Sequence, residues 1–141
     1  ATIQHYEELA TAKGITLNTT INSQLQVRID PQIFRGILSN LLDNATKYCE
    51  RGDSILLTIK LLDQHLLINV SDTGIGMSEE RKNTLFSFEH IETKRGTSGE
   101  KGAGFGLILV HELVKTYDGS IEVISQEGEG SMFEVRLPNI V

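Results

Sequence analysis

Residues 40–48 read NLLDNATKY, and this stretch decides how the rest of the chain is interpreted. Asn40 and Asn44 are four residues apart, so on a helix both amides lie on one face. Lys47 follows three residues later, roughly along the same stripe. Two amide oxygens and a lysine on one face can hold a hydrated Mg²⁺ ion and a phosphate, because Mg²⁺ prefers oxygen ligands. Taken alone, the same pattern also fits an ordinary solvated polar face.

Apolar periodicity places this stretch on a long helix. Asp30-Pro31 suits a helix start, because Asp30 can cap free backbone N–H groups and Pro31 fits the first helical position. The helix is predicted to run to about Cys49. Its apolar stripe consists of Phe34, Ile37, Leu38, Leu41, Ala45 and Tyr48.

The remaining periodic segments alternate between helix and strand patterns. Helices are expected over 3–13, 78–86 and about 105–117, and strands over 15–21, 54–62, 66–71, 121–125 and 132–137. Residues 87–104 show no periodicity, and such a long irregular segment is usually functional or mobile. The pattern predicts an α+β fold, a two-layer α/β sandwich. Its mixed sheet would have about five strands, covered on one face by about three helices.

Composition and charge limit the class of protein. The 141 residues fit one domain, 1–141, and the net charge of −6 argues against nucleic acid as a partner. Cys49 is the only cysteine, which suits a reducing, cytoplasmic compartment. No apolar run approaches the ~20 residues of a membrane span, so we expect no direct membrane contact of this domain. A longer parent protein could still be membrane-anchored.

A second polar signal, Asp72-Thr73-Gly74-Ile75-Gly76, follows directly after a predicted strand. A carboxylate at a strand end is a fixed acceptor, and it could take a hydrogen bond from the exocyclic amine of adenine. Gly74 and Gly76 would let a ligand approach the backbone. A plain turn is the alternative interpretation.

Two glycine-rich signals complete the set. Residues 102–107 read GAGFGL and enter a helix, where free N–H groups and the helix dipole favour an anion. No strand leads into this loop, so it is not a dinucleotide-binding motif, and no Gly-Lys-Ser/Thr makes it a Walker loop. Residues 130–133, GSMF, begin the last strand and could equally be a hairpin turn.

In this order, the four signals resemble the boxes of the GHKL (Bergerat) ATP-binding fold. Residues 40–45 resemble the N box, and 72–76, 102–107 and 130–133 resemble the three glycine boxes. The resemblance extends from about Ile3 to Pro138. Residues 44–48, NATKY, and 115–121, KTYDGSI, are similar to the sensor histidine kinase branch.

The resemblance implies ATP and Mg²⁺ as ligands. Asn44 would coordinate Mg²⁺ with Asn40 assisting, and Asn44 and Lys47 would be the catalytic residues, Lys47 reaching a phosphate. Tyr48 would line the adenine pocket, and Asp72 would read the adenine amine. Further nucleotide contacts would come from Gly74, Gly76, Gly102, Gly104, Phe105, Gly106, Leu107 and Ser131. Residues 87–104 would form a mobile ATP lid, and residues 1–13 a linker helix and first helix.

The implied reaction transfers the γ-phosphoryl group to a histidine on a separate dimerisation domain of the same parent chain, with a response regulator downstream. Hydrolytic members of the superfamily carry a glutamate where Asn40 stands, so water should be a poor acceptor. Two alternatives stay open: a serine kinase of the same fold, such as an anti-sigma factor, and a degenerate nucleotide-binding module. The spacing of Phe86 and Phe88 departs from the family's lid pattern, and Phe105 stands where leucine is common.

His111 lies in a segment, HELVKT, that resembles a phosphoacceptor helix. However, Tyr117 replaces the usual proline, and the segment directly follows the second glycine box. We therefore interpret His111 as a partly exposed helix residue, and we expect no autophosphorylation of this chain.

Overall fold

Five strands form one mixed sheet in the order β1-β2-β3-β5-β4. The computed structural model describes residues 2–22, 26–85 and 106–138. The strands are β1 (Thr16–Ile21), β2 (Ser54–Leu62), β3 (His65–Asp72), β4 (Ser120–Ser125) and β5 (Ser131–Leu137). The helices are α1 (Thr2–Lys13), α2 (Pro31–Tyr48), α3 (Glu79–Asn83) and α4 (Gly106–Thr116). Of the predicted features, the lid over 87–104 lies outside the described residues.

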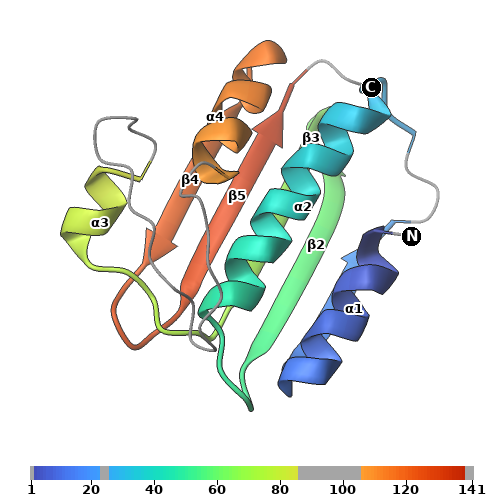
Figure 1. Cartoon of the computed structure of the whole chain (residues 1–141). Coiled ribbons are helices and arrows are strands. Elements are labelled where there is room, and N and C mark those ends of the chain that lie inside the picture. The colour runs from blue at the N-terminus through green and yellow to red at the C-terminus, as the bar shows by residue number, and fades with distance from the viewer. Residues whose placement is uncertain (1, 23–25, 86–105, 139–141) are drawn as a thin grey trace.

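The sheet carries its helices on one face, as predicted. β1 pairs with β2 in parallel, and the other neighbouring strands are antiparallel. Helices α1, α2 and α4 lie side by side over the same face of the sheet (Figure 1). The two-layer α+β prediction is therefore confirmed.

The core fills the space between the sheet and these helices. Every second residue of β3 points into it, and Leu66, Ile68 and Val70 are fully buried because β3 is the central strand. Most of the predicted stripe of α2 is buried as well. Leu42, which the predicted stripe left out, is also fully buried.

Polar contacts fix the two ends of α2. At its start, Asp30 caps the helix by accepting from the Gln32 N–H at 2.8 Å. The Asp30 N–H donates to the Tyr117 hydroxyl at 2.9 Å, which ties the segment after α4 to the start of α2. At its other end, the Lys13 Nζ atom donates to the carbonyl oxygens of Thr46 at 2.8 Å and of Lys47 at 3.2 Å.

Helix α1 contacts α2 at a second point. The buried Tyr6 hydroxyl donates to Asp43 Oδ1 at 2.6 Å. Burial, followed by this bond to a carboxylate, raises the pKa of Tyr6 well above its ordinary value. Asp43 is adjacent to Asn44 in the chain, so α1 contacts α2 within one residue of a predicted site residue.

Two elements differ from the prediction. The alternation of Ile15, Leu17, Thr19 and Ile21 predicts a half-buried strand, but only the beginning of β1 packs inward, and Ile21 at its end is 38% exposed. An edge strand has a neighbour on one side only, which limits its burial. Helix α3 begins as expected after Ser78, whose hydroxyl accepts from the Arg81 N–H at 3.2 Å. It ends at Asn83 and not near residue 86, with Thr84 as its C-terminal cap.

Candidate functional site

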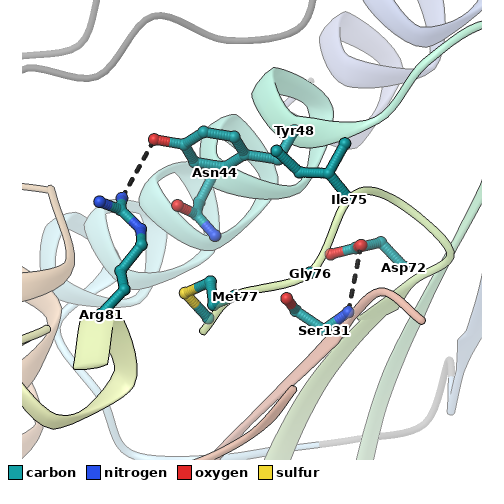
Figure 2. Close-up of a pocket in the computed structure, with 8 residues that line it drawn as sticks. All are labelled: Asn44, Tyr48, Asp72, Ile75, Gly76, Met77, Arg81 and Ser131. Atoms are coloured by element: carbon teal, nitrogen blue, oxygen red, sulfur yellow. Dashed lines mark hydrogen bonds between the residues drawn. The ribbon is translucent and has the colours of Figure 1, made fainter. Parts of the chain in front are cut away.

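A hollow opens between the last turns of α2, the loop after β3, the start of α3 and the start of β5 (Figure 2). Its lining residues come from three stretches that are far apart in the sequence, 44–48, 72–81 and 131. They are Asn44, Tyr48, Asp72, Ile75, Gly76, Met77, Arg81 and Ser131. Three of the four predicted signals therefore meet in one pocket.

Asp72 and Ser131 form what we call the floor of this pocket. Asp72 is the last residue of β3 and is only 7% exposed. Its Oδ1 atom accepts from the Gly74 N–H at 2.9 Å and from the Ser131 N–H at 3.3 Å. Its other carboxylate oxygen points toward the middle of the lining residues (Figure 2). The sequence prediction that Asp72 is a fixed acceptor agrees with this geometry.

Burial disfavours the charged form of Asp72 and raises its pKa to about 6. The two backbone N–H groups oppose this shift, and the nearby Asp53 carboxylate adds to it. Ionisation of this buried carboxyl group therefore lowers the stability of the folded chain. A fold retains such a group when it serves a site, which makes Asp72 a functional candidate.

The glycines of the loop after Asp72 serve packing within the chain. A Cβ atom on Gly74 would lie 2.4 Å from the Tyr48 carbonyl oxygen. One on Gly76, whose φ is +70°, would lie 2.0 Å from the Gln126 carbonyl oxygen. We expected these glycines to admit a ligand to the backbone. In the structure the space beside them is filled by the chain's own main chain.

Lys47, Tyr48 and Arg81 form what we call the cationic wall. The Arg81 guanidinium donates from Nη2 to the Tyr48 hydroxyl at 3.1 Å, and its Cζ atom lies 5.5 Å from the ring centroid. The Lys47 Nζ atom lies 5.1 Å from the same centroid. Two cations thus lie close to one aromatic ring beside the pocket. Tyr48 lines the pocket, whereas Lys47 is not among the lining residues; their contacts with a nucleotide stay predictions.

Asn40 lies one turn before Asn44 on α2, where it faces the start of α4. Its Nδ2 atom donates to the Gly36 carbonyl oxygen at 2.7 Å. Its Oδ1 atom would be 2.9 Å from a Cβ atom on Gly106. Asn40 therefore joins the N-box helix to the described end of the second glycine box. Leu107 is buried in the core beneath it, and Gly102, Gly104 and Phe105 lie outside the described residues.

Sequence reasoning missed three lining residues, Ile75, Met77 and Arg81. Ile75 lies within a motif that was analysed for its carboxylate and its glycines only. Arg81 ends the string Ser78-Glu79-Glu80-Arg81, which was interpreted only as a capped helix start. The tertiary fold brings the start of α3 close enough to the end of α2 for Arg81 to donate to the Tyr48 hydroxyl (Figure 2).

His111 is a partly exposed residue of α4, as predicted. Its side chain is 31% exposed, and its Nδ1 atom lies 3.8 Å from Glu112 Oε1. Within the described ranges, no three or more His, Cys, Asp or Glu side chains come together as a metal site. Within the same ranges, none of the helices is both long and apolar enough to cross a membrane.

A family model described as histidine kinase-, DNA gyrase B-, and HSP90-like ATPase matches residues 29–140. The chain belongs to this family. Within the family it is 33% identical over 135 residues to the sensor histidine kinase TmoS of Ectopseudomonas mendocina. That alignment covers 95% of this chain and 14% of TmoS.

Solved structures of histidine kinases resemble this ATPase-family domain. The crystal structure of full-length ShkA in complex with AMPPNP matches with a TM-score of 0.79 and 28% identity, over 97% of this chain and 28% of ShkA. The nucleotide-free catalytic domain of the histidine kinase ThkA matches in fold with a TM-score of 0.83 and 24% identity, over 97% of this chain and 87% of that structure. The chain is thus a catalytic, ATP-binding domain of the histidine kinase type.

Proposed function

We propose that this domain binds Mg²⁺-ATP in the pocket and transfers the γ-phosphoryl group to a histidine on a separate dimerisation domain. The observation that carries the proposal is Asp72, a buried carboxylate with one oxygen facing the pocket. ShkA, a structural relative, was crystallised with the ATP analogue AMPPNP. Because this chain spans only 14% of TmoS, the dimerisation domain would belong to a longer parent chain, with a response regulator downstream.

The floor suits an adenine base. The exposed oxygen of Asp72 can accept a hydrogen bond from the exocyclic amine, and a hydrogen bond to a charged group is among the stronger polar contacts. Ile75 and Met77 add apolar surface to the same pocket, which favours a flat ring. The pocket therefore combines the two features that an adenine site needs.

The α2 face can supply oxygen ligands for Mg²⁺. The Asn44 amide lines the pocket. The Nδ2 atom of Asn40 donates to the Gly36 carbonyl oxygen, so the amide oxygen of Asn40 is the atom that can bind a cation. Amide oxygens are ligands that Mg²⁺ accepts in proteins, and a bound Mg²⁺ would stabilise negative charge on the phosphates. Lys47 and Arg81 would contribute further positive charge, so that catalysis rests on positioning and electrostatics.

Helix α2 lacks a carboxylate that could activate water. Asn40, at the position of the hydrolytic glutamate, has an amide, which is not a base. Asp43, next to Asn44, faces α1 and accepts from Tyr6 at 2.6 Å. These two observations favour an enzyme that holds ATP for a nucleophile from another domain over one that hydrolyses it.

Calorimetry with Mg²⁺-ADP tests the site. We expect Asp72→Asn to weaken binding by about 1–3 kcal/mol, because the adenine amine loses its charged acceptor. Asp63→Asn is the matched control, since Asp63 lies in the turn between β2 and β3, at the opposite end of β3 from the pocket. Wild-type affinity in a folded Asp72→Asn protein would remove Asp72 from the site.

Labelling with γ-labelled ATP tests the acceptor. The chain alone should give no acid-labile, base-stable label, and addition of its parent's dimerisation domain should give such label on that domain only. His111 lies five residues into α4 from Gly106, about 7.5 Å along a rigid helix that starts at the expected phosphate loop. Label that is abolished by His111→Gln would contradict this proposal, and acid-stable label on serine would favour the serine-kinase alternative.

A further inference from the structure

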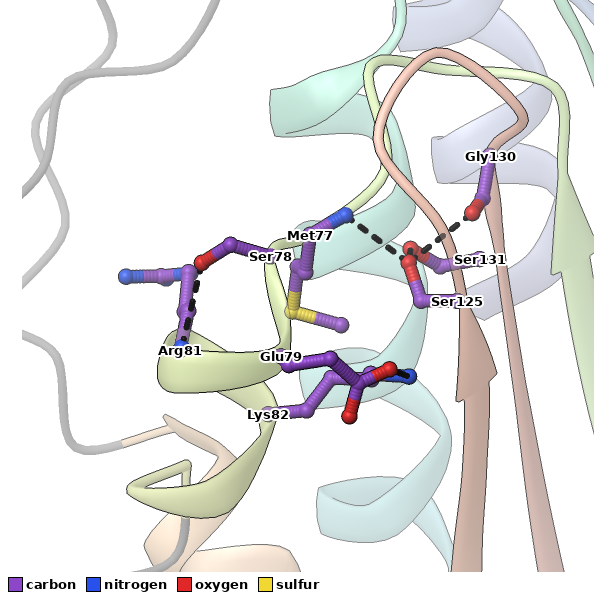
Figure 3. A network of polar contacts seen from close by, with 8 residues as sticks. All are labelled: Met77, Ser78, Glu79, Arg81, Lys82, Ser125, Gly130 and Ser131. Atoms are coloured by element: carbon purple, nitrogen blue, oxygen red, sulfur yellow. Dashed lines mark hydrogen bonds and ion pairs between the residues drawn. The ribbon is translucent and has the colours of Figure 1, made fainter.

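A buried serine outside the pocket holds one of the two floor residues. Ser125 ends β4 and is 7% exposed. Its hydroxyl accepts from the Met77 N–H at 2.9 Å and donates to the Gly130 carbonyl oxygen at 2.9 Å. Its Oγ atom also lies 2.8 Å from the Oγ atom of Ser131 (Figure 3).

The direction of this last hydrogen bond follows from counting donors. A serine hydroxyl has one hydrogen and two lone pairs. The Gly130 carbonyl can only accept, so it takes the single hydrogen of Ser125. The Met77 N–H can only donate, so it occupies one lone pair of Ser125. The contact between the two serines must therefore be donated by Ser131.

Ser131 consequently turns its hydroxyl hydrogen toward Ser125 and away from the pocket. Its N–H group is also engaged, because it donates to Asp72 Oδ1. What Ser131 offers the pocket is the lone pairs of its Oγ atom. With Asp72 ionised beside it, both polar side chains of the floor present acceptors only.

We propose that Ser125 is a specificity-determining positioning residue, which keeps Ser131 an acceptor and so directs the floor toward purines that carry an exocyclic amine. This inference rests on the proposed nucleotide function. We place the C6 substituent of the base, and not N1, against Ser131: adenine carries an amine on C6, whereas hypoxanthine carries a carbonyl oxygen there and its extra hydrogen on N1. An all-acceptor floor bonds the amine and leaves the carbonyl unpaired, and unpaired polar groups discriminate strongly.

Removal of the Ser125 hydroxyl should change which base is preferred. In Ser125→Ala, the Ser131 hydrogen loses its acceptor and can rotate toward the pocket. Ser131 could then donate to the carbonyl of hypoxanthine. A residue with a merely structural role would lower the affinity for both nucleotides by the same factor.

The test measures ADP and IDP by calorimetry with Mg²⁺ at pH 8, where Asp72 is ionised, using the whole chain. We expect the wild type to prefer ADP, and Ser125→Ala to reduce the ratio of ADP to IDP affinity by threefold or more. Because Ser125 acts through Ser131, adding Ser125→Ala to a Ser131→Ala protein should leave that ratio unchanged. If Ser125→Ala does not fold, Ser125→Cys replaces it, since a thiol is a weaker hydrogen-bonding group, and the ratio should fall in the same direction.

Two results distinguish a failure of the role of Ser125 from a failure of the proposed function. An unchanged ratio in folded Ser125→Ala or Ser125→Cys, with ADP still bound by the wild type, overturns the role of Ser125 alone. A wild type that binds neither nucleotide overturns the proposed function, and the inference that rests on it.

Discussion

The floor and the cationic wall of the pocket are built in different ways. In the floor, Asp72 accepts from two backbone N–H groups, and the adjoining turn is packed so closely that a Cβ atom on Gly130 would lie 2.0 Å from the Asp72 carbonyl oxygen. In the wall, the contacts join long side chains, as between Arg81 and Tyr48. Main-chain contacts hold a shape, whereas long side chains can change rotamer. Under the proposed function, this difference would suit the floor to base recognition, and the cations of the wall to adaptation around the phosphates.

The largest expected effect tests how closely the floor is packed. Gly128 and Gly130 share one turn and have φ values of +81° and +83°. A Cβ atom would meet nothing within 4 Å at Gly128 but would meet backbone at Gly130. We expect Gly128→Ala to lower the free energy of unfolding by about 1 kcal/mol and Gly130→Ala by at least about 3 kcal/mol. Urea unfolding measures both, and equal losses would show that the turn is not tightly packed.

The floor should also make stability depend on pH. The pKa of Asp72 rises from its ordinary 3.8 to about 6 in the folded chain, so the folded state binds this proton more tightly. The stability from this group is therefore full below pH 4 and is lost as the pH rises through 6. Asn cannot ionise, so Asp72→Asn should be more stable than wild type by roughly 2 kcal/mol at pH 7.5, with the gap closing near pH 4. A gap that does not vary with pH would argue against the buried charge.

A smaller effect is expected at the α2 face. Asn44→Ala removes an amide oxygen from the pocket, whereas Asn44→Asp keeps an oxygen ligand and adds charge. We expect the alanine variant to weaken ADP binding by about 1–2 kcal/mol in Mg²⁺ and by much less in EDTA, since the lost group acts through the cation. Equal weakening under the two conditions would exclude a metal role for Asn44.

The smallest effect is expected in the wall. Tyr48→Phe keeps the ring near Lys47 and Arg81 but removes the hydroxyl that Arg81 contacts. This contact is partly exposed, so the free energy of unfolding should fall by less than about 0.5 kcal/mol. Tyr6→Phe is the control, because its buried hydroxyl bonds Asp43 and should be worth about 1–2 kcal/mol. A larger loss for Tyr48→Phe in thermal or urea unfolding would mean that the wall is as fixed as the floor.

The sequence was most informative where a motif lies at the end of an element. Asp30-Pro31 gave the start of α2, and Asp72 was found because it directly follows a predicted strand. Asn44 and Ser131 were placed by the same kind of signal. Ser125 was missed, because it lies in a strand without a motif and its partners include Met77, 48 residues away.

Packing between distant segments explains the other differences. The steric role of Gly76 depends on Gln126, which no local pattern connects to it. Arg81 reaches the pocket only through the position of α3. The prediction of one domain over 1–141 stays a prediction. The lid and the nucleotide contacts of Gly102, Gly104 and Phe105 also stay predictions, since residues 86–105 lie outside the described residues.

The contact between Lys13 and α2 has an electrostatic consequence. A helix carries partial negative charge at its C-terminus, and α2 ends beside the pocket that would hold the phosphates. That end would repel a polyanion. The Lys13 ammonium group lies 2.8 and 3.2 Å from two of its last carbonyl oxygens and offsets part of this charge. A residue on another helix thus makes the negative pole of α2 compatible with a negatively charged ligand.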